Sequence, residues 1–244
     1  MSELVQSLLR CKVVGDTLFL PPISEGMLPN YPEVKKALLN AGAKYKRNTF
    51  VFPNDAKPYV DRLTNGESIN IKKEFQFFAT PAPLAARMVK MANINYDHEI
   101  LEPSAGQGAI IKEIHKVLPS KEVCWCELMP ENMQVIFKIP NTVFMYEDFM
   151  EHNVRFKYDR IIANPPFTKN QDIDHIRKMY EVTKPGGVII TLASTSWQRG
   201  GQKKQTEFRE WLFNIGSTIE EIPENTFKES GTSIKTVLIT IPKM

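Results

Sequence analysis

The sequence lacks the features that mark several large classes of protein. It has three cysteines in 244 residues and no CxxC pair, so neither a disulfide scaffold nor a zinc ribbon is predicted. An odd cysteine count is typical of free thiols, and we expect a cytoplasmic protein. No apolar run is long enough to span a bilayer, and no basic-then-apolar segment opens the chain, so neither a membrane partner nor a secretion signal is expected.

The excess of positive charge is small, with 31 Lys and Arg against 28 Asp and Glu. A protein that coats DNA would be more basic, so the charge permits a nucleic-acid partner but does not argue for one. The hydrophobic content of 42% is ordinary for a globular chain. The length suits one α/β domain and a small extra module.

Residues 1–74 differ in texture from the rest and predict a small α+β module, a possible substrate-recognition unit. Short apolar pieces alternate with turns, and a helix is expected to begin around Pro32 and to end at Gly42. Residues 44–52 predict a hairpin with a basic, aromatic tip. Lys46 and Arg47 beside Tyr45 are candidates for contacts with phosphates and a base. The alternative is a solvated basic turn.

Residues 75–244 alternate apolar strands with amphipathic helices. This order predicts a Rossmann-like, doubly wound and mostly parallel sheet with an antiparallel pair at its end. The seven expected strands are residues 99–101, 123–127, 142–146, 158–163, 188–192, 218–222 and 236–241.

The most informative stretch is Asn164-Pro165-Pro166-Phe167, directly after an apolar strand. The prolines cannot continue a ladder, so the strand must stop and place Asn164 at its carboxyl end. Ligands bind at that end in open α/β sheets. An amide oxygen, free carbonyls and an aromatic face suit a planar amino group, such as the exocyclic amine of a nucleobase. The alternative is a proline turn with Phe167 in the core.

A second motif is the glycine turn after the strand at 99–101. Gly106 and Gly108 allow a close approach of backbone to a ligand, but the third glycine of a dinucleotide fingerprint is replaced by Ile111. Glu102 opens the turn, and a carboxylate there disfavours a pyrophosphate and favours a cationic amine. A ligand with an ammonium and a sulfonium, S-adenosylmethionine, therefore fits better than a dinucleotide.

Three further positions fit the same ligand. Glu127 ends the next strand about twenty residues after the glycine turn, the spacing at which a carboxylate takes ribose hydroxyls. Asp148 is a candidate acceptor for an adenine amine, with Phe149 packing on the ring. Thr80 is expected to cap a helix with Pro81 at its first position.

Taken in order, Phe78-Ala79-Thr80-Pro81, Glu102 to Gly108, Glu127, Asp148-Phe149 and Asn164 to Phe167 resemble the class I S-adenosylmethionine-dependent amino-methyltransferases, and most closely the N6-adenine DNA methyltransferases of bacteria and phages. The resemblance implies catalysis by Asn164, Pro165, Pro166 and Phe167. It also implies S-adenosylmethionine as cofactor, S-adenosylhomocysteine as its product, and no metal. The implied cofactor residues are Thr80, Glu102, Pro103, Ser104, Ala105, Gly106, Gly108, Glu127, Leu128, Asp148, Phe149 and Asn164.

DNA is the favoured partner, and the residues predicted to contact it are Lys46, Arg47, Lys169, Trp197, Arg199 and Lys203. The family usually carries a sizeable recognition domain, and we expect none after the catalytic half, which leaves the amino-terminal module as the candidate for that role. Two alternatives stay open: a ribosomal-RNA guanine or adenine N-methyltransferase, and a catalytically idle module that binds nucleic acid or protein with the same fold.

Overall fold

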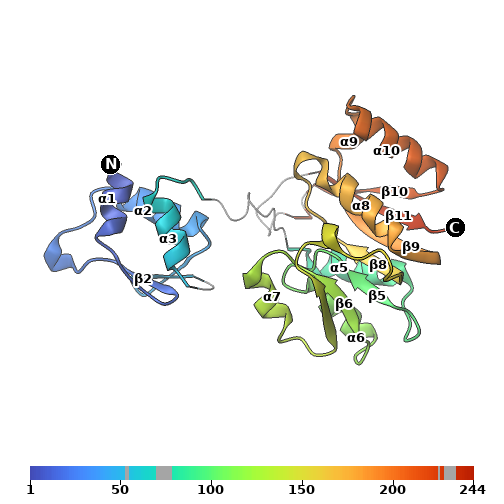
Figure 1. Cartoon of the computed structure of the whole chain (residues 1–244), viewed down its shortest axis with the longest axis horizontal. Helices are drawn as coiled ribbons and strands as arrows, with labels where there is room; N and C mark the ends of the chain where they lie inside the picture. The colour runs from blue at the N-terminus through green and yellow to red at the C-terminus, as the bar shows by residue number, and fades with distance from the viewer. Residues whose placement is uncertain (53–54, 70–78, 225, 228–234) are drawn as a thin grey trace. The chain divides into compact units, whose positions relative to one another are not determined.

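The computed structural model describes residues 1–52, 55–69, 79–224, 226–227 and 235–244. The chain divides into two compact units, Met1–Phe77 and Phe78–Met244 (Figure 1). The boundary predicted between residues 74 and 75 lies outside the described residues. Phe78, the first residue of the predicted motif Phe78-Ala79-Thr80-Pro81, also lies outside them. None of the described helices is long and apolar enough to cross a membrane.

The first unit is an antiparallel sheet of order β1-β2-β4-β3 with helices packed on it. The predicted helix and hairpin are present, and the helix Glu3–Leu9 was not expected. It is capped by Ser2, whose hydroxyl accepts from the backbone N–H of Val5 at 3.3 Å. The elements are α1 (Glu3–Leu9), β1 (Lys12–Val14), β2 (Thr17–Phe19), η1 (Ile23–Glu25), α2 (Tyr31–Asn40), β3 (Lys44–Lys46), β4 (Thr49–Val51) and α3 (Lys57–Thr64).

The second unit confirms the predicted seven-stranded sheet, whose order is β10-β11-β9-β8-β5-β6-β7. The strands from β7 to β9 are parallel, and β11 and β10 complete the sheet antiparallel. The strands are β5 (Ile100–Glu102), β6 (Val123–Cys126), β7 (Thr142–Tyr146), β8 (Tyr158–Ala163), β9 (Thr183–Ser194), β10 (Thr218–Ile222) and β11 (Thr236–Pro242).

Helices cover both faces of this sheet, as expected for a doubly wound fold (Figure 1). One apolar cluster joins α5 and α6 to alternate strand residues such as Ile162 and Ile190, and the other joins α8 and α10 to their neighbours Ile161 and Ile189. The helical elements are α5 (Ala82–Ala92), α6 (Ala109–Val117), α7 (Pro130–Ile136), η2 (Phe149–Glu151), η3 (Thr168–Asn170), α8 (Gln171–Glu181), α9 (Ser196–Arg199) and α10 (Lys203–Asn214).

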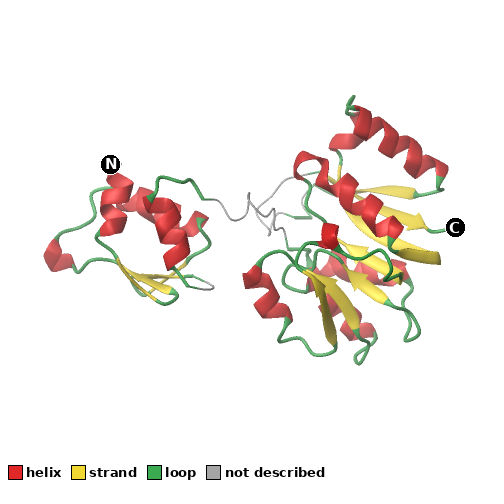
Figure 2. Ribbon diagram, in the orientation of Figure 1, coloured by secondary structure: helices red, strands yellow, loops and turns green. Residues whose placement is uncertain are grey.

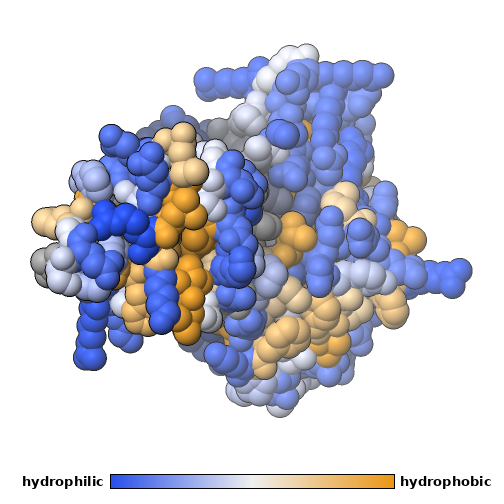
Figure 3. Space-filling model, turned by 60° about the vertical axis from the view of Figure 1, so that its left-hand side comes forward, coloured by the Kyte–Doolittle hydropathy of each residue, from blue (hydrophilic) through white to orange (hydrophobic). Residues whose placement is uncertain are grey.

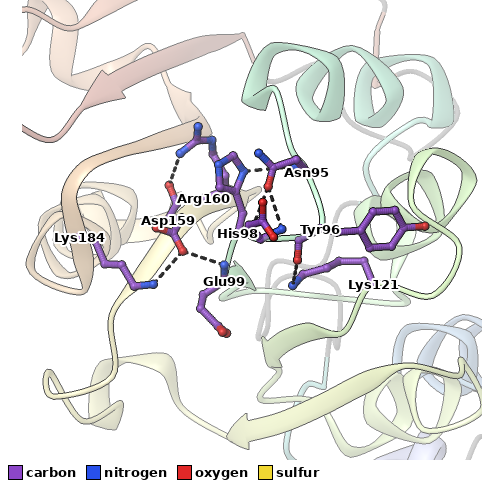
Figure 4. Close-up of polar contacts among 9 residues, drawn as sticks. Asn95, Tyr96, His98, Glu99, Lys121, Asp159, Arg160 and Lys184 are labelled. Carbon is purple, nitrogen blue, oxygen red and sulfur yellow. Dashed lines mark hydrogen bonds and ion pairs between the residues drawn. The ribbon is translucent and has the colours of Figure 1, made fainter.

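The amino ends of the central strands are joined by polar contacts (Figure 4). The carboxylate of Asp159 accepts from the Lys184 ammonium at 2.8 Å and from the backbone N–H of Glu99 at 2.8 Å. Arg160 donates to the carbonyl of Ala92 at 2.7 Å, which ties β8 to the end of α5. These groups have partners within the unit and lie at the end of the strands opposite to the one where ligands bind in such folds, so we interpret the network as structural.

Candidate functional site

The order in which the chain adds strands to the sheet reverses between β5 and β8, which makes this the topological switch point of the fold. From β5 the chain moves outward through β6 and β7, then crosses back to β8 and continues outward through β9 on the other side. β5 and β8 are parallel neighbours, with Leu101 opposite Ile161. A ligand crevice forms outside the carboxyl ends of two such strands. The glycine turn and Asn164 therefore follow the two strands that flank this switch point.

The glycine turn has the backbone that its sequence predicts. Gly106 and Gly108 both have positive φ, 54° and 71°, and Gly108 is the cap of α6. A Cβ on Gly108 would lie 2.7 Å from Cδ1 of Ile139, so that side chain would have to shift, and the positive φ would strain any larger residue. The N–H of Ala105 donates to the carbonyl of Cys126 at 3.0 Å, which holds the turn against β6.

Two buried carboxylates lie under this turn. Glu127 accepts from the backbone N–H of Gly106 at 2.7 Å and of Met129 at 2.8 Å, and from the Asn132 amide at 3.3 Å. Burial raises the pKa of Glu127, and these hydrogen bonds oppose the shift. Its binding of ribose hydroxyls stays a prediction, and the structure adds that this carboxylate fixes the glycine turn.

Glu102 is 2% exposed and accepts from the backbone N–H of Ile111 at 3.1 Å. Burial raises its pKa well above the ordinary value, and the neighbouring Glu127 adds to the shift. A cation or several donors placed beside such a group would stabilise its charged form and reverse part of this cost. The pair is thus suited to a ligand that carries positive charge and hydroxyl groups.

Asn164 is held from the opposite side of the site. Its side-chain NH2 donates to the hydroxyl of Thr80 at 3.1 Å. The expected cap is therefore wrong: α5 begins one residue later than predicted, Pro81 is its N-cap, and no side-chain cap bond is made. The Thr80 hydroxyl instead pairs with Asn164 and is nearly buried, with 8% exposed. With its nitrogen turned towards Thr80, the amide has its oxygen, an acceptor, turned away from Thr80.

The residues after Asn164 turn away from the sheet. Pro165 is buried, Pro166 and Phe167 are half-buried, and Phe167 packs against the apolar cluster of the α5 face. Lys169 follows in η3 with φ of 54° and an exposed side chain. The stretch is thus neither fully in the core nor fully in solvent, as a contact surface for a planar ligand requires.

The positions predicted for the adenine give a mixed result. Asp148 accepts from the N–H of Met150 at 2.8 Å and caps η2, and Leu128 is exposed. Phe149 is only 2% exposed, with its ring 5.7 Å from that of His175. The structure presents no open face of this ring, because the phenyl group lies in the core beneath α8.

The prediction that Trp197 contacts nucleic acid is wrong, because this side chain is buried. Trp197 lies in the short helix α9, and its indole packs edge-on against Phe208 of α10, with 1% exposed. Arg199 and Lys203 are exposed, and Lys203 lies 3.7 Å from Glu207. In the first unit, Lys46 and Arg47 are exposed at the β3–β4 turn, where Arg47 and Asn48 both have positive φ, 47° and 65°.

Two supporting contacts were not predicted. Asn132 of α7 braces Glu127, and the buried Asp172 of α8 accepts from the N–H of Ser194 at 2.9 Å and from its hydroxyl at 2.8 Å. The second contact ties the helix after Phe167 to the end of β9. Asn132 and Asp172 lie in no recognisable sequence motif, so the sequence alone does not single them out. Their burial in the structure identifies them.

The resemblance implies S-adenosylmethionine, and the residues present fit it. The turn at Gly106 and Gly108 admits backbone approach, Glu102 and Glu127 offer carboxylates for a cation and for hydroxyls, and Asp148 and Leu128 lie at the ends of neighbouring strands. Within the described residues no group of three or more His, Cys, Asp or Glu side chains is placed to hold a metal ion.

The fold is similar to those of solved methyltransferases. The methyltransferase subunit of a type I restriction-modification system from Streptococcus thermophilus superposes with a TM-score of 0.58 at 19% identity, over 68% of this chain and 45% of that one. A protein from Pyrococcus horikoshii assigned as an RNA methyltransferase gives 0.52 at 19% identity, over 72% of this chain and 91% of that one.

The sequence itself is similar to the type II methyltransferase M.AccI of Acinetobacter calcoaceticus, with 32% identity over 120 residues. The match covers 47% of this chain and 22% of M.AccI, so the chain corresponds to a minor part of that protein. No family model matches the chain. This similarity and the fold agree with the resemblance to S-adenosylmethionine-dependent methyltransferases.

Proposed function

We propose that the second unit transfers a methyl group from S-adenosylmethionine to an exocyclic amine of a nucleobase, and we favour N6 of adenine in DNA. The observation that carries this proposal is the position of Asn164. Its amide lies at the carboxyl end of β8 beside the switch point, and Thr80 engages its NH2 group. An acceptor oxygen next to two prolines and an aromatic ring suits the two hydrogens of an aromatic amine.

The chemistry requires an acceptor at this place. When bound, the cofactor supplies a methyl group on a sulfonium, which is already a strong electrophile. The target amine is a poor nucleophile, because its lone pair is delocalised into the ring. Hydrogen bonds from the amine to the Asn164 side-chain oxygen and to the Pro165 carbonyl favour a tetrahedral nitrogen. The same acceptors stabilise the positive charge that grows on that nitrogen during transfer.

Phe167 and the prolines complete the proposed target pocket. A base inside a duplex is out of reach, so the target must rotate out of the stack. The half-buried ring of Phe167 is placed to stack on it while the cluster behind holds the ring in position. On the cofactor side, Glu102 and the glycine turn would hold the charged end, and Glu127 the ribose.

The RNA alternative is kept because the superposed protein from Pyrococcus horikoshii is assigned as an RNA methyltransferase and is matched over 91% of its length. The DNA proposal is favoured by the sequence similarity to M.AccI, a type II methyltransferase. Both alternatives use the same amine chemistry and differ in the nucleic acid, DNA or RNA, whose base reaches Asn164.

The test is to incubate the full chain with methyl-labelled cofactor and either DNA or RNA, then to digest the product to nucleosides and identify the labelled one. We expect label in N6-methyldeoxyadenosine, and none with an Asn164→Ala control. Label in an RNA nucleoside alone would transfer the proposal to RNA. A folded chain that binds no cofactor and labels neither substrate would support the idle binding module.

A further inference from the structure

In the first unit, the described helices pack on one side of the sheet. Its inward side chains, Val13, Leu18 and Phe50, belong to the apolar cluster that the helices complete. Tyr45 shares this side, with its ring 5.1 Å from Phe50 and the ammonium of Lys35 4.9 Å from the Tyr45 ring centroid. Figure 2 shows the helices of this unit together on one side of the strands. None of the helices described in residues 1–52 and 55–69 covers the other face of the sheet.

The strand register defines what this outer face carries. Lys12 pairs with Phe19, Phe19 with Thr49, and Thr49 with Lys46, so these side chains form one row across the four strands. The second row runs parallel to the first. The outer face consists of Lys12, Val14, Thr17, Phe19, Lys44, Lys46, Thr49 and Val51. None of these eight residues is acidic.

Hydrophobic strips reach the surface of the first unit, bordered by hydrophilic residues (Figure 3). On the sheet, Phe19 leaves 42% of its surface exposed and Val14 leaves 53%. In the row, Phe19 lies between Lys12 and Thr49, and Lys46 follows Thr49 on the next strand. An exposed aromatic ring that shares its row with two cations on an antiparallel face suits stacking with bases.

Positive charge collects at one end of this face. The β3–β4 turn adds Arg47 at the end where Lys12, Phe19 and Lys46 lie. Asp16, in the β1–β2 turn, lies at the opposite end and accepts from the Thr17 hydroxyl at 2.7 Å. Within the part of the chain that the structure describes, none of these three cations forms an ion pair.

We propose that this outer face binds single-stranded nucleic acid, with a base stacked on Phe19 and phosphates at Lys12, Lys46 and Arg47. The choice of nucleic acid rests on the proposed function, and the face adds a second contact surface for the same substrate. A single strand is required because a base must leave its stack to lie on the ring. A protein partner fits less well, since the cores of protein interfaces are depleted in lysine.

The probe is a fluorescein-labelled 12-nucleotide oligothymidylate bound to the full chain, followed by anisotropy at several salt concentrations. Thymine has no exocyclic amine, so the probe is not a methyl acceptor. Phe19→Ala should weaken binding roughly 5- to 150-fold, the range for loss of one stacked base. Lys46→Ala should reduce the slope of log K against log salt by about 0.7, the value for one phosphate contact on a single strand.

The controls lie on α2, on the helical side of the sheet. Leu39→Ala removes an apolar side chain that is 43% exposed, close to the 42% of Phe19, and Lys36→Ala removes an exposed charge. Neither should change the affinity or the slope. Thermal melts of all four variants should match the parent, which separates loss of binding from loss of fold.

Parental affinity in Phe19→Ala, or a parental slope in Lys46→Ala, would overturn the inference, as would a chain that does not bind the probe. Calorimetry with S-adenosylhomocysteine is run on the same variants. If the parent bound no cofactor but Phe19→Ala and Lys46→Ala still weakened binding of the probe as expected, the proposed function would fail and the nucleic-acid face would remain supported. If methylation were normal and Phe19→Ala bound the probe like the parent, the nucleic-acid face would fail and the proposed function would remain supported.

Discussion

The side-chain amide of Asn164 donates to the hydroxyl of Thr80 at 3.1 Å across 84 residues of sequence. The contact joins the end of β8 to the segment before α5. Because the amide nitrogen is turned towards Thr80, the acceptor oxygen of the same side chain is turned away from it. We therefore interpret Thr80 as a residue that positions Asn164.

A double-mutant cycle tests this relationship. Asn164→Ala should lower single-turnover methylation by at least about 10²-fold, as for loss of one transition-state partner. Thr80→Val should lower it roughly 5- to 10-fold, about the net value of one hydrogen bond. The double variant should be no slower than Asn164→Ala, because Thr80 acts through the amide. Thr80→Ser keeps the hydroxyl and should recover most of the rate. If the losses of the two single variants added up in the double variant, Thr80 would act independently of Asn164.

Much of the second unit was predictable because its signals are local. Apart from β10, which contains two glutamates, the strands are mainly apolar runs, and all seven were predicted within a few residues. The main exception is β9, which begins at Thr183 rather than Val188. Thr183 pairs with Tyr158 and Val188 with Arg160, so the strand contains an irregularity at residues 184–187 that an apolar pattern does not reveal.

The errors at the site have a common physical origin. Thr80 has the residue type of a helix cap, but a partner distant in sequence competes for its hydroxyl. Trp197 lies among polar residues and was expected in solvent, yet one turn of helix buries its ring against Phe208. Tertiary contacts decide both cases, and the local pattern around each residue is silent about them.

Glu127 supplies a second prediction. Its carboxylate receives backbone N–H groups from Gly106 and Met129, and an amide in its place can present only one oxygen to these two donors. Glu127→Gln should therefore weaken cofactor binding by about 1–3 kcal/mol, the cost of charged hydrogen bonds lost or left unpaired. Titration calorimetry with S-adenosylhomocysteine measures it. Glu122→Gln, exposed near the other end of the same strand, is the matched control, and equal affinities of both variants would contradict the assignment.

His175 supplies a prediction about acid stability. Burial lowers its pKa from 6.5 to about 4, opposed by Asp148 and Asp174. In the unfolded chain the imidazole takes its proton first, so stability is complete above pH 6.5 and falls as the pH is lowered towards 4. The loss is about 3 kcal/mol at most, from 1.36 kcal/mol per pKa unit.

Replacement of the imidazole should remove this dependence. The His175 Nδ1 is buried without a hydrogen-bond partner in the described structure, so His175→Leu takes away a polar atom that pairs with nothing. The difference in unfolding free energy between parent and variant is measured by urea titration from pH 8 to pH 4. At pH 8 it reports packing alone. A difference that stays constant down to pH 4 would show that this residue does not sense pH.

Glu102 links the fold to the ligand. Because burial raises its pKa, the folded chain keeps a proton where the unfolded chain has lost it, so stability falls as the pH rises through the raised pKa. Glu102→Gln should then raise the melting temperature of the ligand-free protein at neutral pH and flatten its pH dependence.

A cationic group beside the Glu102 carboxylate favours the ionised form, so cofactor binding should release a proton and strengthen with rising pH. Calorimetry in two buffers of different ionisation enthalpy detects that release, which Glu102→Gln should abolish together with about 1–3 kcal/mol of affinity. Glu99→Gln, exposed before the same strand, should leave both unchanged. If the parent exchanges no proton and Glu102→Gln binds the cofactor equally well, Glu102 only braces the backbone of Ile111.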